Sequence, residues 1–341
     1  VGRCPFDAGL YFVELGCVSP NPKISLVRKG VALCRREGLD FVLAVGGGSV
    51  IDSAKAIAMG AATGRDPWEF ASTGTRPDKT LPAATVLTLA ASGSETSNSC
   101  VLTNEETKEK RGITSETNRP VISFLDPENT FTVSKFQTGC GIVDIMMHTL
   151  ERYLTPEGGE SDLTDRIAEG LLIAVRDAGR RAIADPRDYE ARATLMWAGS
   201  VSHNDYTGCG RKRLFPVHKL EHELSAFRDE IAHGAGLSVL FPAWAEHEMQ
   251  YDYPRFAQFA NRVLGVEMDF EHPERTAREG IRTLRRFFEE IGMPTHLSQL
   301  GIKPENYEKL AANTVRTVNG PVKSYSPLDE KAIIEIYRLA E

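Results

Sequence analysis

The chain has 341 residues, of which 41% are hydrophobic and 26% are charged, and its formal net charge at pH 7 is −7. This length allows two domains with well-buried cores, and the composition is that of an ordinary globular protein. The acidic balance leaves no broad positive surface, which argues against a nucleic-acid-binding protein. No apolar run reaches the roughly 18 residues of a membrane span, which argues against an integral membrane protein.

Six cysteines lie far apart in the sequence, and none forms a CxxC pair. In a chain of this length, such spacing is typical of reduced thiols rather than of a disulfide framework. Residues 1–14 lack the charged-then-apolar pattern of a secretory signal. We therefore expect a cytoplasmic protein, for which homodimerisation is the default assembly.

The first part of the chain alternates short β-branched runs with helical stretches. Residues 31–37 are expected to lie in a helix, residues 40–45 in a buried parallel strand and residues 51–59 in a second helix. Residues 84–89 read as another strand. Strand, turn, helix and strand in this order are typical of an open α/β sheet.

In the second part of the chain, strand-like runs become scarce. Residues 142–153, 162–183 and 189–201 carry apolar residues at helical spacing. We therefore predict an α/β dinucleotide-binding domain at residues 1–135. An all-helical metal-binding and substrate domain is expected at residues 136–341.

Two loops that follow strands have the composition of phosphate-binding turns. In Gly46-Gly-Gly-Ser49 the glycines let backbone N–H groups approach an anion, and Ser49 can cap the next helix or bind a phosphate. A bare GGGS is as often a tight structural turn, because it matches neither GxGxxG nor the Walker pattern. Ser92-Gly-Ser-Glu95 also closes a strand and is expected to open a helix. Both loops would lie at the carboxyl edge of one sheet, which favours a nucleotide or dinucleotide phosphate as ligand.

Histidines and one aspartate gather in two places along the sequence. Asp144 and His148 are four residues apart, so both project from one face of a helix, either as an ordinary surface pair or as half of a metal site. His218, His222 and His233 follow within sixteen residues. Together the two clusters favour a site with nitrogen and oxygen ligands, which suits Fe(II) or Zn(II).

The other cysteine and histidine side chains considered as metal ligands are expected to have structural roles instead. Cys140 precedes Asp144 by one helical turn and is expected to pack rather than to bind metal. Each of the other four histidines is isolated and is expected to be a surface or packing residue: His203, His247, His272 and His296.

The same histidines allow a second interpretation. His218-Lys-Leu-Glu-His222 spells HxxEH, the motif of one class of zinc metallopeptidases, with Glu221 as the general base. This alternative leaves both glycine-containing loops unexplained and gives Asp144 no task. A nucleotide-binding module without catalysis is a third interpretation, and it leaves the histidines unexplained.

Taken in order, the motifs resemble the iron-containing (group III) alcohol dehydrogenases. The resemblance rests on Gly46-Gly-Gly-Ser-Val-Ile-Asp-Ser-Ala-Lys55, Ala91-Ser-Gly-Ser-Glu95, Gly141-Ile-Val-Asp-Ile-Met-Met-His148 with Glu151, His218-x-x-x-His222 and His233-Gly234. Shorter matches are similar to the butanol dehydrogenase-like branch of that family: Pro20-Asn-Pro22, Asp66-Pro-Trp68, Met196-Trp-Ala-Gly199 and His222-Glu-Leu-Ser225.

The resemblance implies a dehydroquinate synthase-like fold with a deep cleft between its two domains. It also implies metal-dependent, NAD(P)-linked interconversion of primary aliphatic alcohols and aldehydes by hydride transfer, with iron or zinc as the metal and NAD or NADP as cofactor. The implied metal ligands are Asp144, His148, His218 and His233. The implied cofactor-binding residues are Gly47, Gly48, Ser49, Asp52, Thr88, Ser92, Ser94 and Lys110, of which Lys110 would approach a ribose.

The catalytic candidate is His222, which the resemblance places beside the metal without binding it. A neutral imidazole there can pass the alcohol proton towards solvent or support the metal ligands, and neither role is favoured.

Three features depart from the family pattern. Ser134 and Gly139 stand where the family commonly has a proline and an alanine. The spacing from His222 to His233 is one residue longer than usual, so a bulge would keep His233 as a ligand whereas a helical shift would not. Family members also carry a few dozen further residues with a first strand, another glycine-rich turn and its helix. We therefore expect this N-terminus to be incomplete, and the choice between NAD and NADP stays open.

Overall fold

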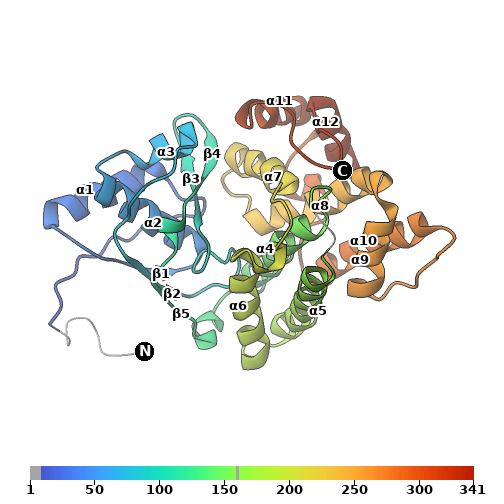
Figure 1. Ribbon diagram of the computed structural model, residues 1–341, viewed down its shortest axis with the longest axis horizontal. Coiled ribbons are helices and arrows are strands. Elements are labelled where there is room, and N and C mark those ends of the chain that lie inside the picture. Colours follow the sequence, from blue (N-terminus) through green and yellow to red (C-terminus); the bar gives the residue numbers. More distant parts are fainter. Residues whose placement is uncertain (1–8, 159–160) are drawn as a thin grey trace.

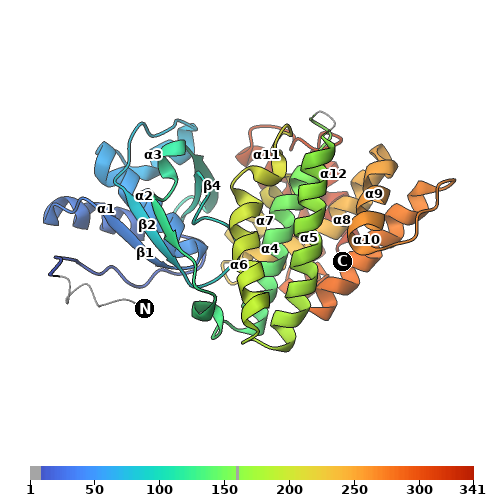
Figure 2. The ribbon, with the colours of Figure 1, turned by 60° about the horizontal axis from the view of Figure 1, so that its bottom comes forward.

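A computed structural model of the chain describes residues 9–158 and 161–341. Expectations that concern residues 1–8, among them Cys4 and most of the stretch compared with secretory signals, lie outside the described residues. Figures 1 and 2 show a part with strands and a part built of helices, lying side by side. The expected fold class, an α/β part followed by an all-helical part, is confirmed.

The α/β part contains a three-stranded parallel sheet of order β1-β2-β5 and a two-stranded antiparallel hairpin, β3–β4. Helix α2 packs against β1 and β2 and also contacts α1 and α3 (Figure 1). The elements in chain order are α1 (Ile24–Glu37), β1 (Val42–Gly46), α2 (Gly48–Thr63), α3 (Pro67–Thr73), β2 (Ala83–Leu87), β3 (Ser99–Asn104), β4 (Glu109–Thr114) and β5 (Ile122–Phe124).

Strand β1 is parallel to β2, as expected, but only one of its faces is buried. Ala44 packs in a cluster with residues of α2, whereas Leu43 and Val45 are 50% and 57% exposed. Through β2, these two residues are in register with Ile122 and Phe124 of β5, which are exposed as well. Parallel strands are ordinarily covered on both faces. The expectation of a fully buried strand is therefore wrong for the described chain.

The loop that contains Ser92 does not open a helix, contrary to expectation. Strand β2 ends at Leu87, and residues 88–98 lead into hairpin β3–β4. The Ser94 hydroxyl donates to Asp52 on α2 at 2.5 Å, and the N–H of Val101 on β3 donates to the other oxygen of Asp52 at 2.9 Å. Asp52 thus holds the loop and the next strand against α2, and these long-range bonds override the local preference for a helix.

The helical part confirms the three predicted helices, which lie within α4, α5 and α6. Helix α4 runs through its centre, buried from Thr138 to Tyr153, and contacts α5, α6 and α8 (Figure 2). None of the helices in the described ranges is both long and apolar enough to cross a membrane. The helices are α4 (Lys135–Tyr153), α5 (Asp162–Ala184), α6 (Tyr189–His203), α7 (Pro216–Phe227), α8 (His233–Glu248), α9 (Tyr253–Leu264), α10 (Pro273–Glu290), α11 (Tyr307–Thr317) and α12 (Glu330–Leu339).

Two departures from the family pattern have local explanations at the start of α4. The Ser134 hydroxyl caps the helix by accepting from the N–H of Gln137 at 3.2 Å. A Cβ at Gly139 would lie 2.6 Å from the sulfur of Met293 and 3.2 Å from the carbonyl oxygen of Ile291. The helix therefore begins normally without the proline, and glycine allows a close approach where the family has alanine.

Candidate active site

A cleft of about 1150 Å³ is lined by both parts of the molecule. Its residues come from the two glycine-containing loops, from hairpin β3–β4 and from helices α4, α7 and α8. Every residue predicted from the sequence for the cofactor, the metal or catalysis lines it: Gly47, Gly48, Ser49, Asp52, Thr88, Ser92, Ser94, Lys110, Asp144, His148, His218, His222 and His233.

The α/β side of the cleft is formed where the two loops meet. Gly47 is the N-cap of α2 and the helix begins at Gly48, so Ser49 lies in the first turn and does not cap it. A Cβ at Gly48 would lie 2.3 Å from the Ser92 hydroxyl oxygen, so a side chain there would have to displace the Ser92 hydroxyl. The N-terminus of α2 offers free N–H groups and the positive end of a helix dipole, which together suit a phosphate.

Lys110 on β4 connects the two sides of the cleft. Its Nζ donates to Asn21 Oδ1 at 3.1 Å and lies 3.6 Å from Glu221 Oε2 on α7. Both side chains of this ion pair are buried. Lys110 therefore lines the cleft from the α/β part and also contacts a carboxylate of the helical part.

Asp144 Oδ1 is the point at which the four predicted metal ligands converge. The nearest nitrogens are His148 Nδ1 at 3.6 Å, His218 Nε2 at 3.7 Å and His233 Nε2 at 3.8 Å. Asp144, His218 and His233 each offer an atom within 4.8 Å of the others, and His148 stands slightly apart from this group. Helices α4, α7 and α8 thus place one carboxylate and three imidazoles around one position.

The donor atoms of this cluster fit a metal ion. Asp144 Oδ1, His148 Nδ1 and His218 Nε2 are buried and have no hydrogen-bond partner among the described residues. Leaving a buried polar atom unpaired costs about 1–3 kcal/mol. A metal ion would satisfy all three atoms, and oxygen and imidazole ligands suit Fe(II) or Zn(II).

Two glutamates orient the histidines of the cluster, a role that was not assigned from the sequence. Glu151 on α4 pairs with Nδ1 of His218, and Glu221 on α7 pairs with Nδ1 of His233. Both carboxylates are buried, and each leaves Nε2 of its histidine directed at Asp144. A carboxylate behind a metal-binding histidine fixes its tautomer and ring orientation. Glu151 follows Asp144 by seven residues, and this helical spacing is the signal that could have identified it.

Charge and burial set the protonation of the histidines. Burial alone would lower the pKa of His218, but the Glu151 and Asp144 carboxylates raise it to about 9. Burial lowers the pKa of His148, and His203 lowers it further. Burial and the nearby Lys110 ammonium likewise lower the pKa of His222. His148 and His222 are therefore neutral imidazoles at pH 7.

The extra residue between His222 and His233 lies in a loop. Helix α7 ends at Phe227 and α8 begins at His233, so residues 228–232 accommodate the insertion. His233 is not rotated out of the site, because its Nε2 lies 3.8 Å from Asp144 Oδ1. The structure therefore shows the bulge rather than the helical shift.

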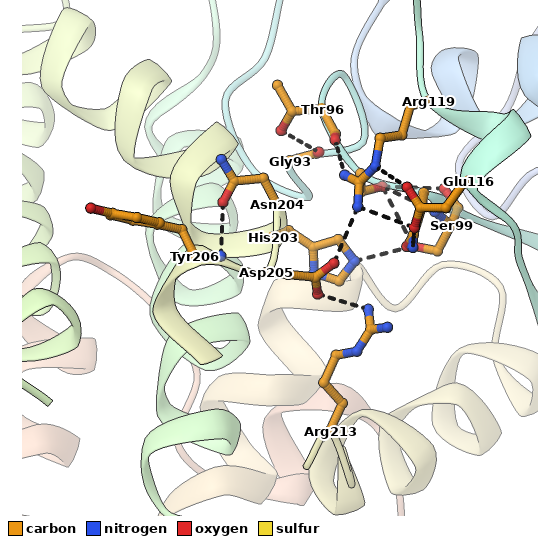
Figure 3. Close-up of polar contacts among 12 residues, drawn as sticks. Gly93, Thr96, Ser99, Glu116, Arg119, His203, Asn204, Asp205, Tyr206 and Arg213 are labelled. Atoms are coloured by element: carbon orange, nitrogen blue, oxygen red, sulfur yellow. Dashed lines mark hydrogen bonds and ion pairs between the residues drawn. The ribbon is translucent and has the colours of Figure 1, made fainter. Parts of the chain in front are cut away.

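Contrary to expectation, His203 is not isolated from the other histidines, although it packs against one of them and is in neither group of candidate metal ligands among the described residues. It lies at the end of α6 and lines the cleft, with its ring centroid 4.1 Å from that of His148. Its Nε2 lies 3.1 Å from the Ser99 hydroxyl oxygen (Figure 3). No spacing in the sequence links α6 to α4 at this point. Cys140, by contrast, is buried, and burial raises the pKa of its thiol to about 12, in keeping with a packing residue.

The sequence matches two related family descriptions along nearly all of its length. Residues 5–127 match "Iron-containing alcohol dehydrogenase", and residues 138–340 match "Fe-containing alcohol dehydrogenase family, C-terminal". The chain belongs to the iron-containing alcohol dehydrogenase family. The resemblance drawn from the motifs is thereby confirmed.

Individual relatives of this iron-containing alcohol dehydrogenase support the same branch. NADH-dependent butanol dehydrogenase A of Clostridium acetobutylicum is 40% identical over 97% of this chain and 85% of its own length. The NADPH-dependent aldehyde reductase YqhD of Escherichia coli is 35% identical over 86% of this chain and 76% of its own. The crystal structure of an NADH-dependent butanol dehydrogenase A from Thermotoga maritima matches with a TM-score of 0.93 and 36% identity, covering 98% of this chain and 85% of that one. These similarities confirm the butanol dehydrogenase-like branch and the fold.

Nothing in the site of this alcohol dehydrogenase supports the metallopeptidase alternative. Glu221 is completely buried, with one oxygen paired to His233 and the other accepting from the Ser225 hydroxyl. A peptidase base must instead present a carboxylate oxygen to the attacking water. The glutamate of the HxxEH motif is therefore a partner of His233 and not a general base.

Proposed function

We propose that this chain is a metal-dependent, NAD(P)-linked alcohol dehydrogenase and aldehyde reductase that interconverts primary aliphatic alcohols and aldehydes by hydride transfer. One observation carries the proposal: a single cleft has phosphate-binding loops on one side and the buried aspartate–histidine cluster on the other. A nicotinamide cofactor bound at the loops and a substrate oxygen bound at the cluster would meet in the cleft, which is the proximity that hydride transfer needs. Family membership and the named activities of the relatives support the same reaction.

The residues of the helical side would hold the metal and the substrate oxygen. Asp144, His148, His218 and His233 are the proposed ligands of an iron or zinc ion. When bound, such an ion supplies Lewis acidity that favours the deprotonated form of the alcohol.

The residues of the α/β side would bind NAD or NADP. Backbone N–H groups at Gly48 and Ser49 are free to bind the pyrophosphate at the start of α2. Asp52 and Ser94 hold the second loop against this helix. The other proposed cofactor contacts line the same side of the cleft: Gly47, Thr88, Ser92 and Lys110.

His222 is our candidate for passing the alcohol proton towards solvent. It lines the cleft, and its ring centroid lies 5.7 Å from that of His233. We expect His222→Ala to retain the metal and lose turnover, whereas His233→Ala should lose the metal itself. Metal content and turnover, measured on both variants, distinguish a metal ligand from a residue that transfers the proton. Loss of metal from His222→Ala would make His222 a ligand, and a fully metallated His233→Ala would remove His233 from the ligand set.

The function itself is tested by metal analysis of anaerobically purified protein, together with oxidation of NADH and of NADPH in the presence of butanal. We expect one metal ion per chain and aldehyde-dependent oxidation of at least one cofactor. Failure to oxidise either cofactor with metal bound would contradict the proposal. Casein cleavage serves as the control for the peptidase alternative.

We also propose a domain boundary between residues 135 and 136, a cytoplasmic location and a homodimer. Helix α4, the first of the helical part, begins at Lys135. The cysteines in the described ranges are free, which suits a reducing compartment. Closed dimers are the commonest assemblies of such proteins, and light scattering coupled to gel filtration would measure the state.

A further inference from the structure

The end of the cleft beside His203 is bordered by a group of arginines. Arg119, Arg152 and Arg213, which we call the arginine cluster, converge on the carboxylate of Asp205. Arg213 lies 3.0 Å from Asp205 Oδ1, Arg119 lies 3.2 Å from Oδ2, and Arg152 lies 3.9 Å from Oδ1. Figure 3 shows Arg119 and Arg213 approaching Asp205 from opposite sides, next to the His203 ring.

The carboxylates of this group do not balance its arginines. Besides Asp205, the group contains Glu116, which pairs with Arg119 at 2.7 Å. Burial lowers the pKa of Arg152 to about 10, so this guanidinium still carries its charge at pH 7. Within this group, three guanidinium ions face two carboxylates, which is an excess of one positive charge.

Arg213 is the member of the arginine cluster that lines the cleft. Its side chain is 36% exposed, and its ion pair with Asp205 involves one of its two terminal nitrogens. A guanidinium has five N–H donors in a planar fork, so several remain open to a ligand in the cleft.

An aromatic ring, that of Phe215, lies beside both the metal site and Arg152 of the arginine cluster. The centroid of Phe215 lies 5.0 Å from that of His218, and the guanidinium carbon of Arg152 lies 4.8 Å from the Phe215 centroid. Phe215 also lines the cleft. The cleft therefore offers an apolar surface next to the metal site, at a residue two positions after Arg213 in the chain.

We propose that this enzyme prefers aldehydes and alcohols that carry a carboxylate at the far end of a short alkyl chain, with Arg213 as the specificity-determining residue. This inference rests on the proposed function and specifies its substrate class. A metal site, an apolar ring and a guanidinium in one cleft match carbonyl, alkyl chain and carboxylate. Guanidinium binds carboxylate through two parallel hydrogen bonds. The excess of a single positive charge matches a carboxylate better than a dianionic phosphate.

The test compares two aldehydes of equal carbon number, 4-oxobutanoate and butanal, which differ only in the terminal carboxylate. For each protein we would measure the ratio of kcat/KM for 4-oxobutanoate to kcat/KM for butanal, with metal content as a further readout. We expect a ratio well above one in the unmodified enzyme. Because the hydrogen bonds between two charged groups are lost, Arg213→Gln should lower this ratio roughly tenfold or more. Arg213→Lys keeps the charge without the fork and should lower it less.

Lys212→Gln is the matched control. Lys212 neighbours Arg213 in sequence, is exposed, pairs with Glu157 and does not line the cleft. This variant removes the same charge from the same loop, and its ratio should equal that of the unmodified enzyme. An equal fall in both variants would show a general effect of charge and would overturn the assignment to Arg213.

The remaining outcomes separate this inference from the proposed function. The inference is overturned if the ratio is unchanged in Arg213→Gln, or if only the KM for the nicotinamide cofactor rises. Reduction of butanal would still support the proposed function in that case. If neither aldehyde is reduced, the proposed function is wrong. The inference can then be tested separately, by measuring the affinity of the metal-loaded protein for 4-hydroxybutanoate by calorimetry. Binding that weakens about tenfold in Arg213→Gln supports the inference. Equal or absent binding overturns it.

Discussion

In the proposed metal site, Glu221 acts through His233 rather than as a ligand. Its carboxylate is buried, and burial alone would raise its pKa. The charges of His233 and Lys110 reverse this effect and lower the pKa, so the group is ionised. An ionised carboxylate on Nδ1 of His233 keeps Nε2 directed at Asp144.

We therefore expect Glu221→Gln to weaken metal binding about 10- to 100-fold, because the neutral amide no longer fixes the tautomer of His233. Competition with a chromogenic chelator measures this affinity. Glu248→Gln is the control, since Glu248 is also buried and hydrogen-bonded but its partners are Ser324, Ser326 and His247. Equal metal affinities in the two variants would contradict the role given to Glu221.

His247, at the end of α8, links stability to pH. Its Nδ1 lies 2.9 Å from Glu248, and its Nε2 lies 3.6 Å from Glu335. The hydrogen bond to Glu248 raises the pKa of His247 in the folded state above its ordinary value near 6.5. A raised folded pKa means that the charged form stabilises the fold below about pH 6.5, and that this contribution is lost as pH rises through the folded pKa.

His247→Ala should therefore lower the free energy of unfolding by about 1 kcal/mol more at pH 6 than at pH 9, because a charged hydrogen bond contributes more than a neutral one. Urea unfolding at the two pH values measures the difference. A loss that is the same at both values, or larger at pH 9, would show that the ion pair does not stabilise the fold.

Spacing in the sequence identifies interacting residues most directly where they share one element. Asp144 and His148 are one turn apart on α4, and the spacing predicted that they act together. His203 and Arg213 reach the same cleft from α6 and from the loop before α7, and no sequence distance encodes that meeting. Glu221 shows a further limit, because the HxxEH pattern is present while the carboxylate points to His233.

At the scale of elements, the crossing of α4 and α8 brings Asp144 and His233 of the proposed metal site together. A Cβ at Gly234 in α8 would lie 2.2 Å from the carbonyl oxygen of Cys140 and 2.6 Å from its Cα. Only glycine permits this backbone contact. It holds His233 on one helix against Asp144 on the other.

Gly234→Ala should force these helices apart, lowering the free energy of unfolding by about 3 kcal/mol, the upper range for overpacking, and weakening metal binding. Gly170→Ala is the matched control, because a Cβ at Gly170 on α5 meets nothing within 4 Å. That variant should be stabilised by about 0.5–1 kcal/mol, since alanine favours the helix interior. Thermal unfolding compares the two, and a neutral Gly234→Ala would show that the crossing is not tight.

Elements were predictable where local periodicity decides the structure. Helices α4, α5 and α6 carry apolar residues at helical spacing throughout, and all three predictions are confirmed. Hairpin β3–β4 was missed because its position depends on bonds between Asp52 and residues more than forty positions away.

At the scale of the molecule, the order of motifs predicted a cleft between an α/β part and a helical part. What the sequence did not predict is the open apolar face of the sheet, formed by Leu43, Val45, Ile122 and Phe124 in the described chain. An unbroken apolar run indicates a strand buried on both faces. Whether each face is covered depends on other segments of the protein, so this property cannot be derived from the strand alone.

The central claim is that one metal site and one cofactor site act together in a single cleft. The direct test is the rate of butanal reduction by metal-free protein titrated with Fe(II) under anaerobic conditions, with saturating NADH or NADPH. The rate should rise linearly and stop rising at one equivalent of metal per chain, and His218→Ala should show no such rise. A rate that is independent of added metal, or the same titration curve in His218→Ala, would contradict the claim.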